Sequence, residues 1–415
     1  MFDNQIDSGK DGSPDSFELP LPPKYGIDDK ASAIDILIWE HCRSPENLLH
    51  LFVMKKSLHR VTQDDIAEAA PDPDALAEKD LIYSGKEKMA VRWKNGKPQY
   101  LMQGIPLEDV EAYEDSQSGT GCYLSALCFQ YQATLDMGVL ERAHVVFEAL
   151  YSIYELGCQE QKGWLPKPYG FKCTKQGSMD NQCDYYQGLI RYYSYAPPSD
   201  KKKIRRVLVD EMDYWIRNRY KMHVPYFGQW VDYASEKFYP GHWPLFFLPL
   251  CDAVWKITGD EKYREEYNWL LGRTEIAADK DPQHLITNIR ALHRWHYEFD
   301  ALLEQGAEPR EMWLRGLKYQ IEAFKFAEAK MIDLNYFNFD TDARHHEYMW
   351  LVPRREENRI NIENKLMSMR LEDFLYVFPG YGKTKPLSYR EKAITVGSLA
   401  KWLGTYWKGR IMGNW

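Results

Sequence analysis

Several common signatures are missing from the 415-residue chain, and each absence removes a class of protein. No run of about eighteen apolar residues exists, so a membrane-spanning helix is not expected. The seven cysteines form no Cys-x-x-Cys pair and no Cys/His zinc spacing, so neither a disulfide framework nor a zinc site is predicted. A glycine-rich phosphate-binding loop is also missing. We therefore expect no metal, nucleotide or flavin cofactor.

Positive charge is also in short supply. The chain carries 61 Asp and Glu residues against 53 Lys and Arg residues, which gives a formal net charge of −8. Proteins bind nucleic acids through a surplus of basic side chains, so a general nucleic-acid-binding role is not expected. An anionic ligand would instead have to meet a local group of basic residues.

The beginning of the chain lacks an apolar segment. It starts Met1-Phe2-Asp3-Asn4, and residues 1–30 are rich in Asp, Ser, Gly and Pro. This composition predicts an extended arm, followed by a single domain over residues 31–415. Without an apolar signal region, the protein is either cytoplasmic, or periplasmic or secreted after removal of an export signal. The sequence leaves both open.

Aromatic residues, by contrast, are abundant. They make up 14% of the chain, with 29 Tyr and 14 Trp. Extended carbohydrate sites use such rings as stacking platforms, but a large helical core also consumes aromatic side chains. Both explanations stay open.

A repeated unit begins near Gly119, with a spacing of roughly 55 residues. Each unit combines an aromatic-rich helix, a short turn and a second, more charged helix. In the first three turns, an Asp stands where its side chain can cap the following helix. The turns lie at residues 134–138, 197–201, 258–262 and 304–308.

Paired helices of this kind predict an all-α fold, specifically an α/α toroid, which is an incomplete barrel of helical hairpins around a cavity. The alternative is an open α-solenoid. Long loops at residues 157–181 and 223–241 favour a toroid with long loops at the mouth of its cavity. An Asn-Gly turn between alternating segments predicts a small β-hairpin at residues 91–100.

The most informative segment for chemistry is residues 288–299. Read as a helix, it places Arg290, His293, Arg294 and Tyr297 on one face, opposite an apolar face. This face could simply be solvated. However, solvated faces usually carry Lys and Glu, whereas Arg, His and Tyr can hold a carboxylate and move protons.

Two loops lead into predicted inner helices. In the first, Asp180 or Asn181 is either a helix cap or a polar group at the cavity mouth beside Tyr185 and Tyr186. The second runs over residues 236–244 and contains His242. A His at a helix N-terminus tends to be neutral, which suits a proton acceptor.

Trp164 lies in a third loop, with Pro and Tyr neighbours at residues 164–170. This loop could form a sugar-stacking rim, although loops rich in Pro and aromatic residues are also ordinary packing.

Cleavage of a uronic-acid polymer by β-elimination needs groups of the kinds found here. The C6 carboxylate must be neutralised, the C5 proton removed and the O4 leaving group protonated. Arg and Asn can stabilise the developing negative charge, and His and Tyr can act as base and acid. A nearby Arg also favours tyrosinate, which helps a phenol act near neutral pH.

The segment from Arg290 to Tyr297 resembles the Arg-Ala-Leu…Tyr helix of α/α-barrel alginate lyases of polysaccharide lyase family five. That helix carries an Arg and a catalytic Tyr seven residues apart. In that family, an Asn-His pair precedes it. Here His242 lies 48 residues before Arg290 but follows Gly241 instead of Asn. The residues that could replace this Asn as carboxylate neutraliser are Asn181, Asn288 and Arg294.

The repeats, the length and the Asp-Asn-Gln-Cys-Asp-Tyr-Tyr loop are more similar to polysaccharide lyase family thirty-eight, whose α/α-barrel members cleave alginate or glucuronan. The resemblance implies a lyase with an anionic polysaccharide substrate. Tyr297 would transfer the proton, His242 would be its partner, and Arg290 would bind the carboxylate. The residues expected to bind substrate are Glu236, Trp243, His293, Arg294, Asp180, Tyr185, Tyr186 and Trp164.

Two other functions fit the same fold. An unsaturated-glucuronidase-like hydrolase would use Asp180 or Asp184 as general acid, with Tyr297 only lining the site. Its Ser-x-Asp-Gln-like loop is matched loosely here, because Asn181 separates Asp180 from Gln182. A carbohydrate-binding or scaffold protein would use the aromatic segments without chemistry.

Overall fold

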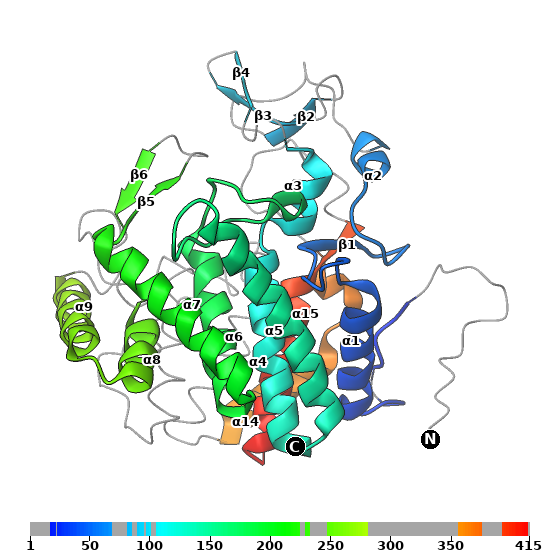
Figure 1. Ribbon diagram of the computed structural model, residues 1–415. Helices are drawn as coiled ribbons and strands as arrows, with labels where there is room; N and C mark the ends of the chain where they lie inside the picture. Colours follow the sequence, from blue (N-terminus) through cyan, green and yellow to red (C-terminus); the bar gives the residue numbers. More distant parts are fainter. Residues whose placement is uncertain are drawn as a thin grey trace.

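The computed structural model describes residues 17–21, 23–68, 81–84, 89–94, 97–100, 105–224, 229–232, 247–280, 356–375 and 392–413. Most of these residues are helical, which confirms the predicted all-α class (Figure 1). The α-helices are α1 (Ile27–His41), α2 (Gln63–Glu68), α3 (Leu107–Tyr113), α4 (Ser116–Thr134), α5 (Met137–Cys158), α6 (Met179–Tyr195), α7 (Pro198–Arg217), α8 (Leu248–Thr258), α9 (Glu261–Lys280), α14 (Glu356–Ser368) and α15 (Val396–Ile411).

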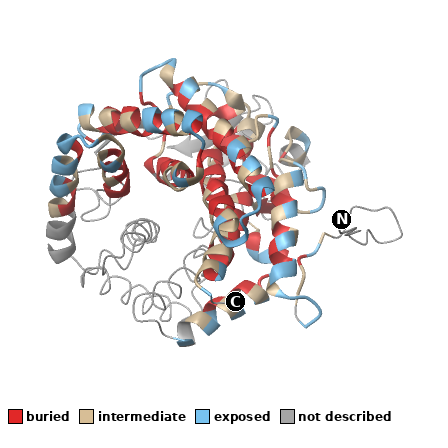
Figure 2. Ribbon diagram, turned by 60° about the horizontal axis from the view of Figure 1, so that its bottom comes forward, coloured by how far each residue is buried: buried red, intermediate tan, exposed pale blue. Residues whose placement is uncertain are grey.

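The long helices pack in two rows. In the first row, α15 packs against α4, α4 against α6, and α6 against α8. The second row contains α1, α5, α7 and α9, so that α4–α5, α6–α7 and α8–α9 are helical hairpins. The described helices follow an open curve (Figure 2). The paired helices expected from the repeat are therefore present.

Two of the predicted Asp caps are confirmed. Asp136 precedes α5 and accepts a hydrogen bond from the Gly138 N–H at 2.8 Å. Asp260 precedes α9 and accepts one from the Lys262 N–H at 3.0 Å. Each carboxylate satisfies a backbone donor that the helix itself leaves unpaired. A local hydrogen bond to the capping Asp therefore starts the helix that follows the first and the third turn.

The cap predicted in the second turn, from Asp200, does not form. Helix α7 begins at Pro198 and its cap residue, Pro197, makes no side-chain cap. Asp200 instead lies inside the first turn of α7 and is buried. Its carboxylate accepts a hydrogen bond from the Tyr192 hydroxyl of α6 at 3.0 Å. Pro fits the first helical position because it lacks an N–H there, so no Asp cap is needed.

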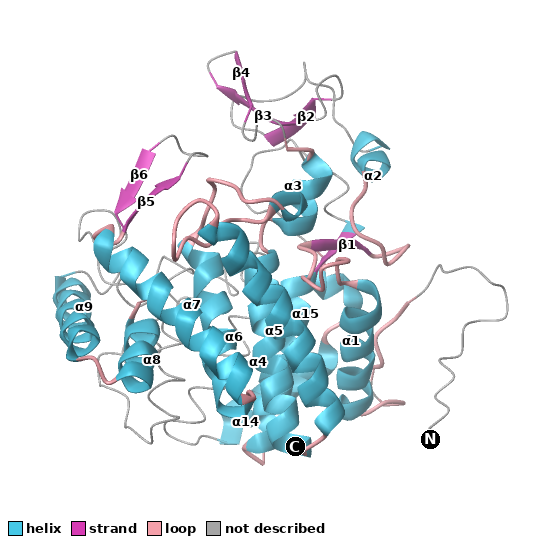
Figure 3. Ribbon diagram, in the orientation of Figure 1, coloured by secondary structure: helices cyan, strands magenta, loops and turns pink. Residues whose placement is uncertain are grey.

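Short strands lie at one end of the helices (Figure 3). The predicted hairpin at residues 91–100 is confirmed, since β3 and β4 pair antiparallel with Lys94 opposite Lys97. The prediction was incomplete, because β2 also pairs with β3, and β1–β7 and β5–β6 form two further antiparallel pairs. The strands are β1 (Phe52–Met54), β2 (Leu81–Ser84), β3 (Met89–Lys94), β4 (Lys97–Tyr100), β5 (Lys221–Val224), β6 (Gln229–Asp232) and β7 (Ala393–Thr395).

The second-row helices are amphipathic. In α7, Ile204, Val207, Leu208 and Trp215 are buried, and the helical period places them on one face. The charged segment 201–206 supplies Lys and Arg side chains to the other face. Burial of such apolar side chains holds the two rows together. None of the described helices has the length and apolar character needed to cross a bilayer.

Candidate functional site

Helices α4 and α6 approach each other closely at Gly121, in the second turn of α4, and Gly188, near the middle of α6. A Cβ added to Gly121 of α4 would lie 2.2 Å from the backbone oxygen of Asp184, and one added to Gly188 of α6 would lie 2.6 Å from the oxygen of Gly121. Both distances are far below normal contact, so only glycine permits this approach. The close crossing brings side chains near the two helix starts within hydrogen-bonding distance.

Asp184 is held by this crossing. The Ser118 hydroxyl of α4 donates a hydrogen bond to its Oδ2 atom. The Asp184 residue is only 6% exposed. A buried carboxylate with a fixed hydrogen bond keeps a defined position, which is what a general acid, a base or a sugar-binding group requires.

Asp184 belongs to a polar stripe on α6, which we define as Asp184, Gln187 and Arg191. At about 100° per residue, these three lie within about 60° of one another. The Arg191 guanidinium lies 4.4 Å from the ring centre of Phe129 on α4, within the range of a cation–π interaction. The stripe therefore combines a carboxylate, an amide and a cation beside α4.

The opposite side of α6 faces the second row. Tyr185 donates its hydroxyl hydrogen bond to the Leu150 backbone oxygen of α5 at 3.0 Å, and Tyr192 donates to Asp200 of α7 at 3.0 Å. These tyrosines lie about 110–130° around the helix from the centre of the stripe. The polar stripe is therefore turned away from α5 and α7.

Two amides hold the loop before α6 against the starts of α4 and α6, and a third joins the start of α6 to the residues before α4. Gln117 donates to the Pro166 oxygen, and Gln182 donates to the Leu165 oxygen at 3.2 Å. Asn181 donates to the Glu114 backbone oxygen at 2.8 Å. Among the described residues, no hydrogen-bond partner is found for the buried Oε1 atoms of Gln117 and Gln182. The loop is thus positioned by amide donors.

Several site residues predicted from the sequence lie in the described part of the chain, and their side chains make packing contacts. Tyr185 and Tyr186 are fully buried, and Tyr186 donates to the Cys183 sulfur at 3.2 Å. Burial raises the pKa of both tyrosines well above its ordinary value. Trp164 is 6% exposed and donates from Nε1 to the Thr174 oxygen at 3.0 Å. These rings show little surface, and a sugar-binding role for them stays a prediction.

Asn181 is also buried, at 4% exposure, and its amide supports the chain at Glu114. Asp180 lies in the first turn of α6, and only its backbone is described. The remaining candidates lie outside the described residues. They are Tyr297, His242, Arg290, Glu236, Trp243, His293 and Arg294.

Sequence reasoning missed Ser118, Gln187 and Arg191. The spacing of Asp184, Gln187 and Arg191 is visible in the sequence as a polar period within a Tyr-rich helix, and it could have been found. Ser118 had no such signal, because it meets Asp184 only through the packing of two helices. No protein-family model, curated protein or solved structure matches the chain.

Proposed function

We propose that the protein is a polysaccharide lyase that cleaves a 1,4-linked polyuronate, such as alginate or glucuronan, by β-elimination. The observation that carries the proposal is the polar stripe of α6, which turns a carboxylate, an amide and an arginine away from the second row of helices. In an α/α toroid, that side of a first-row helix would line the sugar cavity. The two rows of helical hairpins support this architecture.

The chemistry is assigned to the segment 288–299 and the loop 236–244. Tyr297 or His242 removes the C5 proton, and the electrons of that C–H bond form the C4–C5 double bond as the C4–O4 bond breaks. The other group, or the same tyrosine, returns a proton to O4. Arg290 neutralises the C6 carboxylate and stabilises the negative charge that develops on it.

The contacts of Asn181 refine this assignment. Its amide already donates to the Glu114 oxygen, so that donor is used to hold the chain. Breaking the bond would leave a part-buried carbonyl without its partner. We therefore assign neutralisation of the substrate's C6 carboxylate to Arg290 and Arg294, and we treat Asn181 as a positioning residue.

Arg191 fits a supporting role at the sugar, because an Arg can pair with the carboxylate of a neighbouring uronic acid in the polymer. Asp184 is only 6% exposed and accepts a hydrogen bond from Ser118, so it fits a positioning role on the same stripe. The Phe129 ring under Arg191 restricts the orientation of the guanidinium. This arrangement suits a polymer that carries one carboxylate on every sugar.

A hydrolase that acts on unsaturated uronyl oligosaccharides is the second candidate. The burial of Asp184 and its hydrogen bond from Ser118 favour it, since a general acid must be held at a fixed place in a site of low polarity. In this alternative, Asp184 would protonate the leaving oxygen, or protonate the double bond so that a water molecule adds to the other carbon, and Tyr297 would only line the site.

Two substitutions separate the candidates. Tyr297→Phe removes one hydroxyl and should lower polymer cleavage by about 10²-fold or more, because it deletes a proton-transfer group. Asp184→Asn should lower it much less. New reducing ends on the polymer give the lyase rate, and loss of the double-bond absorbance on pre-formed unsaturated oligosaccharides gives the hydrolase rate. Circular dichroism checks that both variants fold. If Asp184→Asn were the inactive variant and Tyr297→Phe kept its activity, the lyase assignment would be wrong.

A further inference from the structure

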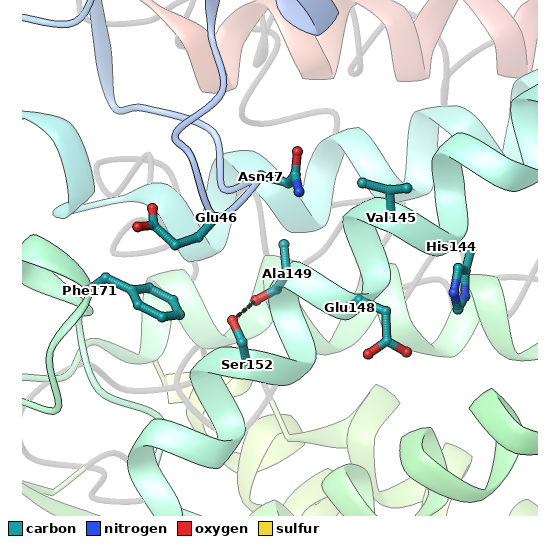
Figure 4. Close-up of a pocket in the computed structure, with 8 residues that line it drawn as sticks. All are labelled: Glu46, Asn47, His144, Val145, Glu148, Ala149, Ser152 and Phe171. Atoms are coloured by element: carbon teal, nitrogen blue, oxygen red, sulfur yellow. Dashed lines mark hydrogen bonds between the residues drawn. The ribbon is translucent and has the colours of Figure 1, made fainter.

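A second group of reactive side chains lies on the outer row of helices, apart from the polar stripe of α6. It consists of His144 and Glu148 on α5 and Asp200 on α7. One ligand atom from each residue lies within 4.8 Å of the other two. His144 and Glu148 are four residues apart, so they share one face of α5. Figure 4 shows both side chains extending from the same side of this helix.

Asp200 is the fixed part of the group. Its side chain is 3% exposed, and its Oδ2 atom lies 2.7 Å from the His144 Nδ1 atom. The Tyr192 hydroxyl donates to the same oxygen at 3.0 Å, and the Ser199 hydroxyl donates to Oδ1 at 3.2 Å. Outer hydrogen bonds of this kind orient the carboxylate ligands of metal sites.

The other two side chains are accessible. The His144 side chain is 49% exposed and that of Glu148 is 37% exposed. Both line an open hollow of about 350 Å³, together with Glu46, Asn47 and Phe171 (Figure 4). An ion and its bound water could therefore reach the group from solvent.

A cation already occupies one side of this group. The Lys203 ammonium of α7 donates to both Glu148 carboxylate oxygens, at 2.7 and 2.8 Å. The hydrogen bond to Glu148 is the main factor that raises the pKa of Lys203. The Lys203 side chain is 36% exposed, and an exposed ion pair of this kind contributes little to stability. It can swing into water when a stronger cation arrives.

We propose that His144, Glu148 and Asp200 bind one divalent cation of the Zn²⁺ type, which joins α5 to α7 and displaces Lys203. An imidazole nitrogen with two carboxylate oxygens suits Zn²⁺ or Co²⁺ rather than Mg²⁺ or Ca²⁺. Bonds of about 2.0–2.2 Å require the ligand atoms to close in slightly. The exposed side chains of His144 and Glu148 can make this movement. A water molecule would complete the coordination.

Calorimetric titration of the full chain with Zn²⁺, after treatment with a chelator, tests the site. We expect one ion to bind per chain, and His144→Ala to weaken binding by more than about tenfold, since even outer-sphere changes cost about that much. Lys203→Met should tighten binding, because it removes the competing ammonium. His41→Ala is the control, since this exposed histidine lies at the end of α1, and it should leave binding unchanged.

Titration with Co²⁺ adds a readout that reports coordination directly. The visible absorption of bound Co²⁺ should show an environment with fewer than six ligands in the wild type and lose it in His144→Ala. Circular dichroism checks the fold of each variant. Failure of both the wild type and Lys203→Met to bind either ion would overturn the site. Binding that is the same in His144→Ala as in the wild type would also overturn it, by placing the ion elsewhere.

Discussion

The contact between α4 and α6 predicts a large effect for a very small substitution, Gly121→Ala. The added methyl carbon would lie 2.2 Å from the Asp184 backbone oxygen and 2.5 Å from its carbonyl carbon, whereas ordinary contact begins at 3.4 Å. The obstacle is the backbone of a neighbouring helix, so it cannot rotate away as a side chain could. The two helices would have to separate by about 1 Å.

The expected loss follows from this separation. Overpacking of a rigid core typically costs 1–3 kcal/mol, so we expect the free energy of unfolding to fall by about 3 kcal/mol. The separation would also pull Ser118 away from Asp184 and disturb the polar stripe. Denaturant unfolding measures this change, provided that the free energy of unfolding depends equally steeply on denaturant concentration in both variants.

Gly404→Ala is the matched control. It lies within α15, and among the described residues no heavy atom beyond its chain neighbours and the backbone of α15 lies within 4 Å of its added Cβ. Ala favours a helix over Gly, so this variant should be unchanged or more stable by up to about 1 kcal/mol. If Gly121→Ala proved as stable as Gly404→Ala, the close helix contact, and the geometry of the site built on it, would be refuted.

Two further substitutions test buried groups. Glu211 of α7 is fully buried, and among the described residues neither carboxylate oxygen has a hydrogen-bond partner. Burial raises its pKa, so the protein should lose stability as the pH rises above about 4.3, where the unfolded chain ionises but the folded one does not. Glu211→Gln should remove this loss. The denaturation midpoint of the variant should therefore exceed that of the wild type by more at pH 8 than at pH 5. An equal difference at the two pH values would contradict the raised pKa of Glu211. Asn181→Asp turns a donor to the Glu114 oxygen into an acceptor and should cost about 1–3 kcal/mol, whereas a stable variant would show that this bond is dispensable.

Local chemistry accounts for what the sequence predicted about the fold. Asp136 and Asp260 cap the helices that follow them because the capping bond spans only two residues. The Asn-Gly turn likewise identified the β3–β4 pair from neighbouring residues. Asp200 has the same residue type in a similar turn, but the Pro198 start of α7 and a hydroxyl from α6 decide its position. Tertiary packing therefore overrides the local signal there.

The candidate site was less predictable, because its contacts join separate helices. Ser118 and Asp184 meet only because Gly121 and Gly188 let two backbones approach. Tyr185 and Tyr186 follow a polar segment in the sequence, but the helical period turns Tyr185 toward α5, and both rings are buried. For the same reason, the grouping of His144 with Asp200 has no sequence signature, since its members belong to different hairpins.

The most direct test of the proposed function compares two signals from one reaction. The protein is incubated separately with polymannuronate, polyguluronate and glucuronan, and both new reducing ends and the ultraviolet absorbance of a C4–C5 double bond are followed. The lyase proposal predicts that the two signals rise together, one double bond for each reducing end, on at least one polymer. Reducing ends without the absorbance, or no change on any of the three polymers, would contradict it.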